Sequence, residues 1–153
     1  MRNLIFVFVF ALFASFQSCR KVNCEDYVCF TSPQPFYFEL LDSATHEDLF
    51  VNGTLDSNQI EVFNIANNNK VDYKYVRADS NSAVVIYGIG WELERTQVEV
   101  TLRVSSKDIL NLYLDSESIS ENCCTFTEYH EIRIENAHYE IDKETGNYKV
   151  FIN

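Results

Sequence analysis

Hydrophobic and polar residues alternate along most of the chain from residue 36 onward. The alternation is clearest over residues 97–104, where valine or leucine occupies every second position between polar residues. A period of two predicts β-strands with one buried face. The segments with this pattern are residues 36–42, 48–51, 59–65, 70–77, 83–89, 97–104, 110–114, 126–134, 137–142 and 148–152.

Some of these segments carry further information. Residues 83–89 are apolar on both faces, which predicts a central strand. Between Phe126 and Tyr129 the alternation slips by one residue, which predicts a β-bulge. The last two segments flank residues 143–147, where Gly146 supplies the positive φ that a hairpin turn needs.

About eight to ten short strands with frequent turns predict an all-β fold. We expect an antiparallel β-sandwich, Ig-like or transthyretin-like, with a small β-barrel as the alternative. Parallel βαβ architecture is excluded, since no segment has the period of an amphipathic helix of ten or more residues. The sandwich occupies residues 36–153, and the polar residues 19–35, broken by Pro33 and Pro35, form a tether before it.

The first residues of the chain have a different pattern. Arg2 is their only charge, and residues 4–16 are apolar apart from Ser15. This run is shorter than the roughly 20 apolar residues that span a bilayer. A basic start followed by a short apolar run is typical of a secretory signal, here residues 1–18.

The end of this signal, Phe16-Gln17-Ser18-Cys19, resembles the bacterial lipobox. Gln17 and Phe16 depart from the small residue and the leucine that lipoboxes prefer, and loose lipoboxes of this kind are typical of the Bacteroidota. The resemblance implies that residues 1–18 are cleaved and that Cys19, lipidated on sulfur, becomes the first residue. Acyl chains contribute about 0.8 kcal/mol per buried CH₂, which suffices for a stable anchor. The alternatives are an uncleaved membrane anchor and a secreted protein with an incidental cysteine.

Composition narrows the function classes. Cleavage would leave 135 of 153 residues, enough for one domain. The formal net charge of −11 becomes −12 once Arg2 is removed. So acidic a surface repels phosphate backbones, and we expect no nucleic-acid binding.

Four cysteines follow Cys19, in two groups far apart in the sequence: Cys24 and Cys29, then Cys123 and Cys124. Outside the inner membrane an even number of cysteines indicates disulfides. Adjacent strand residues face opposite ways, so Cys123 and Cys124 are poorly placed to bond each other. Each is expected to bond Cys24 or Cys29, with the pairing left open. The competing interpretation is a four-thiolate zinc site, which the spacing disfavours.

No catalytic residue, metal site or cofactor is predicted. The histidines His46, His130 and His138 form no HExxH motif and are expected at the surface or in cross-strand pairs. No G-x-S-x-G motif or glycine-rich phosphate loop occurs. A carboxylate pair of the glycosidase type could be drawn from Glu92, Glu94, Glu128 and Glu131, although a solvated acidic face is the favoured explanation.

Trp91 is the only tryptophan, and it follows Tyr87 and two glycines. The glycines would let a loop present Tyr87 and Trp91 as a platform for a sugar or a protein. The simpler interpretation, which we favour, is that Trp91 caps the core at a strand end.

Asp42-Ser43-Ala44 resembles the O-glycosylation motif of Bacteroidota envelope proteins. The motif lies in a predicted turn, where a transferase would reach Ser43. Ser43 is therefore a candidate O-glycosylation site.

Taken together, the chain resembles the small uncharacterised lipoproteins of Flavobacteriia. The features that carry this resemblance are the lipobox, the Cys24/Cys29 pair, the strand-rich body, the segment 123–127 and the terminal hairpin. Surface-exposed lipoproteins of that phylum often have acids directly after the lipid cysteine, whereas this chain has Arg20 and Lys21. This difference favours the periplasmic face of the outer membrane, and the surface face stays open.

The sequence thus predicts a lipid-anchored, non-enzymatic envelope protein that binds another envelope component, either a protein or a glycan. Two alternatives remain. One is a carboxylate-based envelope hydrolase, and the other is a structural subunit of an outer-membrane complex.

Overall fold

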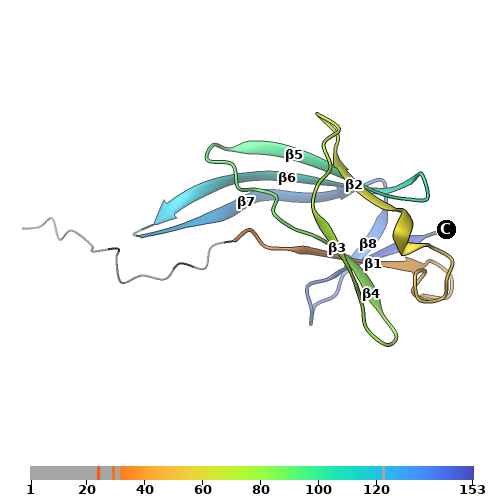
Figure 1. Cartoon of the computed structure of the whole chain (residues 1–153). Helices are drawn as coiled ribbons and strands as arrows, with labels where there is room; N and C mark the ends of the chain where they lie inside the picture. Colours follow the sequence, from red (N-terminus) through yellow and green to blue (C-terminus); the bar gives the residue numbers. More distant parts are fainter. Residues whose placement is uncertain (1–23, 25–28, 30–31, 122) are drawn as a thin grey trace, which may run out of the picture.

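A computed structural model describes residues 24, 29, 32–121 and 123–153 (Figure 1). The predicted signal peptide and Cys19 lie outside these residues. No α-helix of ten or more residues occurs in the part described, and the 3₁₀ turn η2 spans Ser57–Gln59. The strands are β1 (Phe36–Asp42), β2 (Ile60–Asn64), β3 (Tyr73–Arg77), β4 (Ser82–Ile86), β5 (Thr96–Val104), β6 (Lys107–Glu121), β7 (Cys124–Glu135), β8 (His138–Ile141) and β9 (Tyr148–Ile152).

The strands form two sheets, with the orders β3-β4-β1-β9-β8 and β2-β5-β6-β7. This arrangement confirms the all-β sandwich and not the closed barrel. Both sheets are mainly antiparallel, as predicted, and the exception is the pair of β1 and β9, which run parallel. A parallel pair needs a long connection, and most of the domain separates these two strands in the sequence.

The core lies between the two sheets and follows the alternation in the sequence. Alternate residues of β1, of the later part of β5 and of the first part of β6 are buried there, as is the single buried valine of β9. The residues with essentially no exposed surface include Phe36, Phe38, Leu40, Val100, Leu102, Leu110, Leu112, Leu114 and Val150. A fully buried aliphatic or aromatic side chain contributes about 1.5–3 kcal/mol, so this cluster is the main source of stability.

The predicted strand at residues 48–51 is a turn. Asp48 makes an isolated bridge with Leu41, and its carboxylate then accepts the N–H groups of Phe50 and Val51 at 2.9 and 3.0 Å. The same carboxylate accepts the N–H and the hydroxyl of Ser82. A buried aspartate that satisfies these donors stabilises a turn against the extended conformation.

The β6–β7 hairpin is longer than the sequence predicted, because β6 continues from the leucine repeat to Glu121. Its far part extends beyond the body of the sandwich toward the left of Figure 1. The predicted bulge occurs in β7 at His130, one residue after the expected interval, since Asp115 pairs with Glu131 and Ser116 with Tyr129. A bulge increases the local twist, so it changes the direction of the hairpin where the hairpin leaves the body.

Two further predictions are confirmed. β4 is an interior strand between β3 and β1. The terminal hairpin pairs β8 with β9, and Gly146 has a φ of +77° in its turn. This positive φ favours glycine at that position.

Candidate functional site

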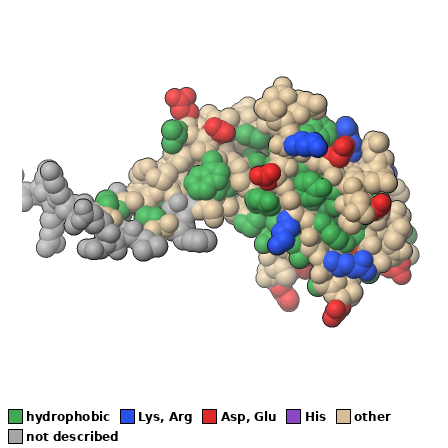
Figure 2. Space-filling model, in the orientation of Figure 1, with side chains coloured by type: hydrophobic (Ala, Val, Ile, Leu, Met, Phe, Trp, Pro, Cys, Tyr) green, Lys and Arg blue, Asp and Glu red, His purple; other side chains and the backbone are tan. Residues whose placement is uncertain are grey.

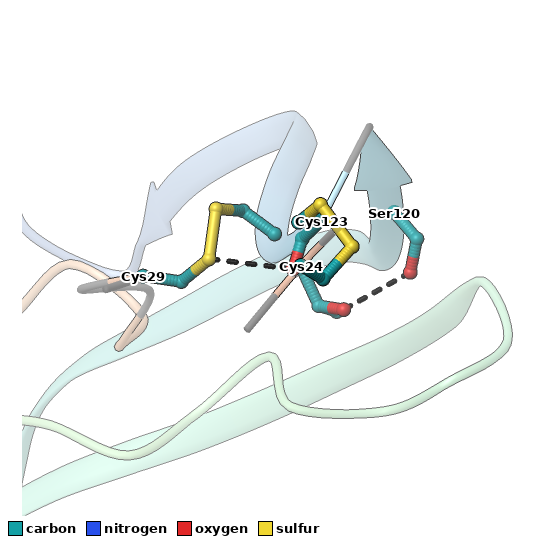
Figure 3. The surroundings of a disulfide bond; sticks show 6 residues. Cys24, Cys29, Ser120 and Cys123 are labelled. Atoms are coloured by element: carbon teal, nitrogen blue, oxygen red, sulfur yellow. Dashed lines mark hydrogen bonds between the residues drawn. A yellow bond between two sulfur atoms is a disulfide. The ribbon is translucent and has the colours of Figure 1, made fainter. Parts of the chain in front are cut away.

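Two disulfides join the N-terminal segment to the tip of the β6–β7 hairpin (Figure 3). Cys24 bonds Cys123, and Cys29 bonds Cys124. The cross-chain linkage predicted from the sequence is confirmed, and the structure supplies the pairing. Since all four thiols are consumed, the zinc interpretation is wrong.

The bridges close a narrow end of the molecule. The last hairpin pair is Glu121 with Cys124, and the hydroxyls of Ser120 and Thr125 lie 3.0 Å apart just behind it. The sulfur of Cys29 lies 3.3 Å from the carbonyl oxygen of Cys123 (Figure 3). The chain leading to β1 is therefore tied covalently to a hairpin that is almost a hundred residues away in sequence.

The connection between β4 and β5, residues 87–95, exposes apolar side chains near this end. Tyr87, Trp91 and Leu93 are 42%, 50% and 85% exposed. The preferred interpretation of Trp91 as a core cap is therefore not what the structure shows. Figure 2 shows hydrophobic side chains at the surface across this face of the body, in the half nearer the hairpin tip as well as in the other half. We call residues 87–95 the apolar loop.

Hydrogen bonds from the hairpin hold the apolar loop in place. The hydroxyl of Thr127 donates to the carbonyl of Gly90 at 2.8 Å, and the hydroxyl of Tyr129 donates to the carbonyl of Ile89 at 3.1 Å. Burial raises the pKa of Tyr129 to about 12, so its hydroxyl remains a donor at neutral pH. The loop is thus fixed to β7 at Ile89 and Gly90, directly before Trp91.

Only glycine fits at position 90. Its φ is +94°, and a Cβ there would lie 3.0 Å from the Thr127 methyl carbon and 3.2 Å from the Ser116 and Tyr129 oxygens. Just beyond it, the N–H of Ser118 donates to the carbonyl of Glu92 at 3.1 Å. The sequence signal for this contact was the glycine pair before Trp91.

An ion pair between an exposed arginine and a buried carboxylate lies where the apolar loop joins β5. Arg95 binds the Asp115 carboxylate with two nitrogens, at 2.8 and 2.7 Å. This guanidinium holds the pKa of Asp115 below its usual value. The neighbouring Ser116 hydroxyl is buried and makes no hydrogen bond within the part of the chain that the structure describes.

A second surface feature is a groove on the outer face of the β1-β9-β8 sheet. Two cross-strand rows form its floor. The register places Glu39 beside Lys149 in the floor, and Glu140, on the edge strand β8, lies beside Lys149 at the rim. The next row places Leu41 beside Phe151, and Phe151 beside His138.

The walls of this groove come from the 46–52 turn and the β3–β4 turn. The ring of His46 lies 5.1 Å from the ring of Phe151, and Ser80 and Asn81 line the opposite side. This open groove has a volume of about 580 Å³, within the range of small-molecule sites. We call this feature the sheet groove.

Charge in the sheet groove is mainly negative. Glu39, Glu47, Asp48 and Glu140 line it together with a single lysine, Lys149. Several of these groups already have partners. Asp48 stabilises its turn, Glu39 accepts a hydrogen bond from Asn147 at 2.6 Å, and Lys149 binds Asp142 at 2.6 Å. Glu47 and Glu140 remain exposed on the rim.

The carboxylates considered for hydrolysis serve other contacts or lie on the surface. Glu131 forms an ion pair with Arg133, and the backbone of Glu92 binds β6. Among the histidines, His130 contacts Glu117 across β6 and β7 at 2.7 Å. Within the described residues, no three His, Cys, Asp or Glu side chains form a group that could hold a metal ion.

Ser43 lies in the exposed turn after β1, as the sequence predicted. Asp42 accepts the N–H groups of Ala44 and Thr45, and these bonds hold its pKa below the usual value. The Ser43 hydroxyl donates to the side chain of Asn153. The position is accessible, and its glycosylation stays a prediction.

Sequence reasoning missed the sheet groove. A signal was present, since the outward positions of β1, β8 and β9 combine acids with Phe151 and His138 instead of short polar residues. Assigning those positions to one surface required the strand order, which the sequence does not provide.

The geometry defines a disulfide-linked all-β sandwich. Comparison of the chain with protein-family models, with curated proteins and with solved structures finds no significant match. None of the helices in the described ranges is long and apolar enough to cross a membrane.

Proposed function

We propose that this chain is a non-enzymatic, lipid-anchored protein of the bacterial cell envelope that binds a basic segment of another protein in the sheet groove. The observation that carries the proposal is the combination of an apolar floor, formed by Leu41 and Phe151, with an acidic rim in a single concave site. The lipid anchor is Cys19, for which the lipobox-like sequence is the support.

The chemistry of the groove favours a lysine- or arginine-containing segment. The aliphatic part of such a side chain packs on Leu41 and Phe151, while its charged end reaches Glu47 or Glu140. An arginine also stacks well on an aromatic ring. The overall acidity of the chain adds long-range attraction for a basic partner.

The location in the envelope rests on the signal-like N-terminus and on the disulfides. Bridges of this kind persist where the compartment is oxidising and are rare in a reducing cytosol. Two of them in one small domain therefore support export.

Binding of a fluorescent arginine-rich peptide tests the proposal. Replacing the rim acids, Glu47→Gln and Glu140→Gln together, should weaken binding about five- to tenfold, since an exposed ion pair contributes up to about 1 kcal/mol. The matched control is Glu94→Gln with Glu128→Gln, which removes the same charge outside the groove. The control should bind nearly as tightly as the unmodified protein.

Equal losses in the two double variants would mean that the peptide responds only to net charge, and the groove proposal would be wrong. A neutral oligosaccharide that binds in the groove, with no binding of the peptide, would assign the site to a glycan instead. Peptide binding should also weaken as salt rises, because the rim acids are exposed.

A further inference from the structure

The apolar loop lies near the end of the molecule where the N-terminal segment is attached. We propose that Tyr87, Trp91 and Leu93 contact the interface of the same membrane that holds the lipid on Cys19. This inference rests on the lipid anchor of the proposed function, and it adds a second point of membrane contact.

The first step is the length of the tether. Cys24 follows Cys19 by five positions in the sequence. A fully extended chain spans at most about 3.6 Å per residue, so the Cα of Cys24 lies within about 18 Å of the lipidated residue. Because Cys24 is bonded to Cys123, the hairpin tip is held at nearly the same maximum distance from Cys19.

The second step is the position of the apolar loop on the hairpin. The loop contacts β6 at Ser118, three residues before the last paired residue, Glu121. At about 3.3 Å per residue, Ser118 is about 10 Å from the end of the hairpin ladder. Figure 1 shows the β4–β5 connection and the hairpin tip in the same half of the molecule, away from the C-terminus. The tether, the Cys24–Cys123 bridge and this length of hairpin together place the contact at Ser118 within about 40 Å of Cys19, so the exposed side chains can reach the membrane that holds the lipid.

The third step is the chemistry of the exposed residues. Tryptophan and tyrosine concentrate at the level of lipid headgroups, where one part of the ring is apolar and the other is hydrated. The hydrogen bonds from Thr127 and Tyr129 fix the loop, so little conformational freedom is lost on contact.

Glu92 and Glu94 decide the type of membrane surface. Both side chains are exposed within the apolar loop and would repel anionic headgroups. The occupant that fits is therefore a zwitterionic lipid surface. Contact should weaken as anionic lipid is added, and salt should partly restore it.

This orientation leaves the sheet groove available. β1 runs from the tether toward Asp42, and the groove is lined by the later residues of that strand together with the turns at 46–52 and 80–81. An end that touches lipid and a groove farther along the body can be occupied at the same time.

The single tryptophan allows a direct test. The lipoprotein is purified from its own membranes, its acyl mass is measured, and it is reconstituted in zwitterionic vesicles containing brominated lipids. Bromine placed near the headgroups should quench Trp91 strongly, and bromine near the chain ends should quench it weakly. Leu93→Ser should reduce the quenching. Val76→Ser removes another exposed apolar side chain, 42% accessible against 85% for Leu93, near the β3–β4 turn and should leave the quenching unchanged.

The outcomes separate the two proposals. A mature protein without acyl mass would contradict the lipid anchor, as would a Cys19→Ser variant that is processed and retained like the native chain. An acylated protein whose Trp91 is not quenched would overturn the membrane contact alone. Photocrosslinking from position 91 to a protein, with no quenching by lipid, would also overturn it and assign the loop to a protein partner.

Discussion

The β6–β7 hairpin passes through two environments, and the residues of β6 differ accordingly. In the first, Leu110, Leu112 and Leu114 point into the core and have no exposed surface. In the second, which begins at Asp115, the buried positions are filled by a carboxylate and by Ser116, and the strand then becomes partly exposed up to Glu121. We call these parts the core half and the tip half.

The two halves are stabilised by different means. The core half gains the transfer of leucine side chains from water, which requires no particular partner. The tip half depends on specific bonds, namely the two disulfides, the Arg95–Asp115 ion pair and the contacts to the apolar loop. Where a hairpin extends beyond the core, covalent links replace the stability that burial would provide.

Among the changes that test this difference between the two halves, removal of both disulfides should have the largest effect. Closing a loop of roughly a hundred residues is worth about 4–5 kcal/mol in the chain-entropy model, and loss of a native bridge typically costs 2–5 kcal/mol. We expect the variant with Cys24, Cys29, Cys123 and Cys124 all changed to serine to lose several kcal/mol of unfolding free energy, measured by denaturant titration.

Hydrogen exchange shows where that stability is lost. In the variant, the amides of the tip half should exchange through local opening, faster than global unfolding allows. The amides of the core half should exchange only through global unfolding. A single Cys24→Ser, Cys123→Ser pair should give an intermediate result. Uniform acceleration in both halves would contradict the division of the hairpin.

The core half could be predicted from the sequence and the tip half could not. Alternating valine and leucine over residues 97–104 and 110–114 identify inward faces, because burial of apolar side chains dominates there. In the tip half the buried residues are Asp115 and Ser116, on opposite faces of the strand, and a hydrophobic pattern assigns both to solvent. The end of β6 was missed for this reason.

Other features of the molecule could also be predicted only in part from the sequence. Cys123 and Cys124 are adjacent on a strand and face opposite ways, and this predicted that each bonds one of the early cysteines. Which cysteine bonds which depends on the hairpin geometry, which the sequence does not state. The sheet groove required β1, β9 and β8 to be neighbours, which is a long-range property. Residues 48–51 alternate like a strand, but the carboxylate of Asp48 makes a turn of them.

A matched pair of glycine variants tests the contact between the tip half and the apolar loop. Gly90 and Gly88 both have positive φ, which costs a non-glycine residue about 1–2 kcal/mol. At Gly90 an added methyl also meets Thr127, Ser116 and Tyr129, and overpacking of this kind costs about 1–3 kcal/mol more. At Gly88 no heavy atom lies within 4 Å of the added carbon.

We therefore expect Gly90→Ala to destabilise more than Gly88→Ala, and the difference between their unfolding free energies isolates the close approach. Gly90→Ala should also change the emission of Trp91, the next residue. Equal losses in the two variants would mean that the loop moves away from β7 without penalty, and the fixed position inferred for Trp91 would be wrong.

The smallest effect at neutral pH is expected for Tyr129→Phe, which removes the hydrogen bond to Ile89 but keeps the ring against Phe36. Such a bond contributes about 0.5–1.5 kcal/mol.

The Tyr129→Phe variant becomes more informative at high pH. Burial raises the pKa of Tyr129 to about 12 from its ordinary value of 10.0, so folding binds the phenolic proton more tightly. The stability that this group contributes is complete below pH 10 and is lost as the pH rises toward 12. In the native protein the unfolding free energy should fall across that interval, and hydrogen exchange should detect the first opening at residues 87–95. Tyr129→Phe should flatten this fall. Some slope should remain, because burial also raises the pKa of Tyr148. An unchanged slope in Tyr129→Phe would show that this hydroxyl does not control the attachment of the apolar loop to the hairpin.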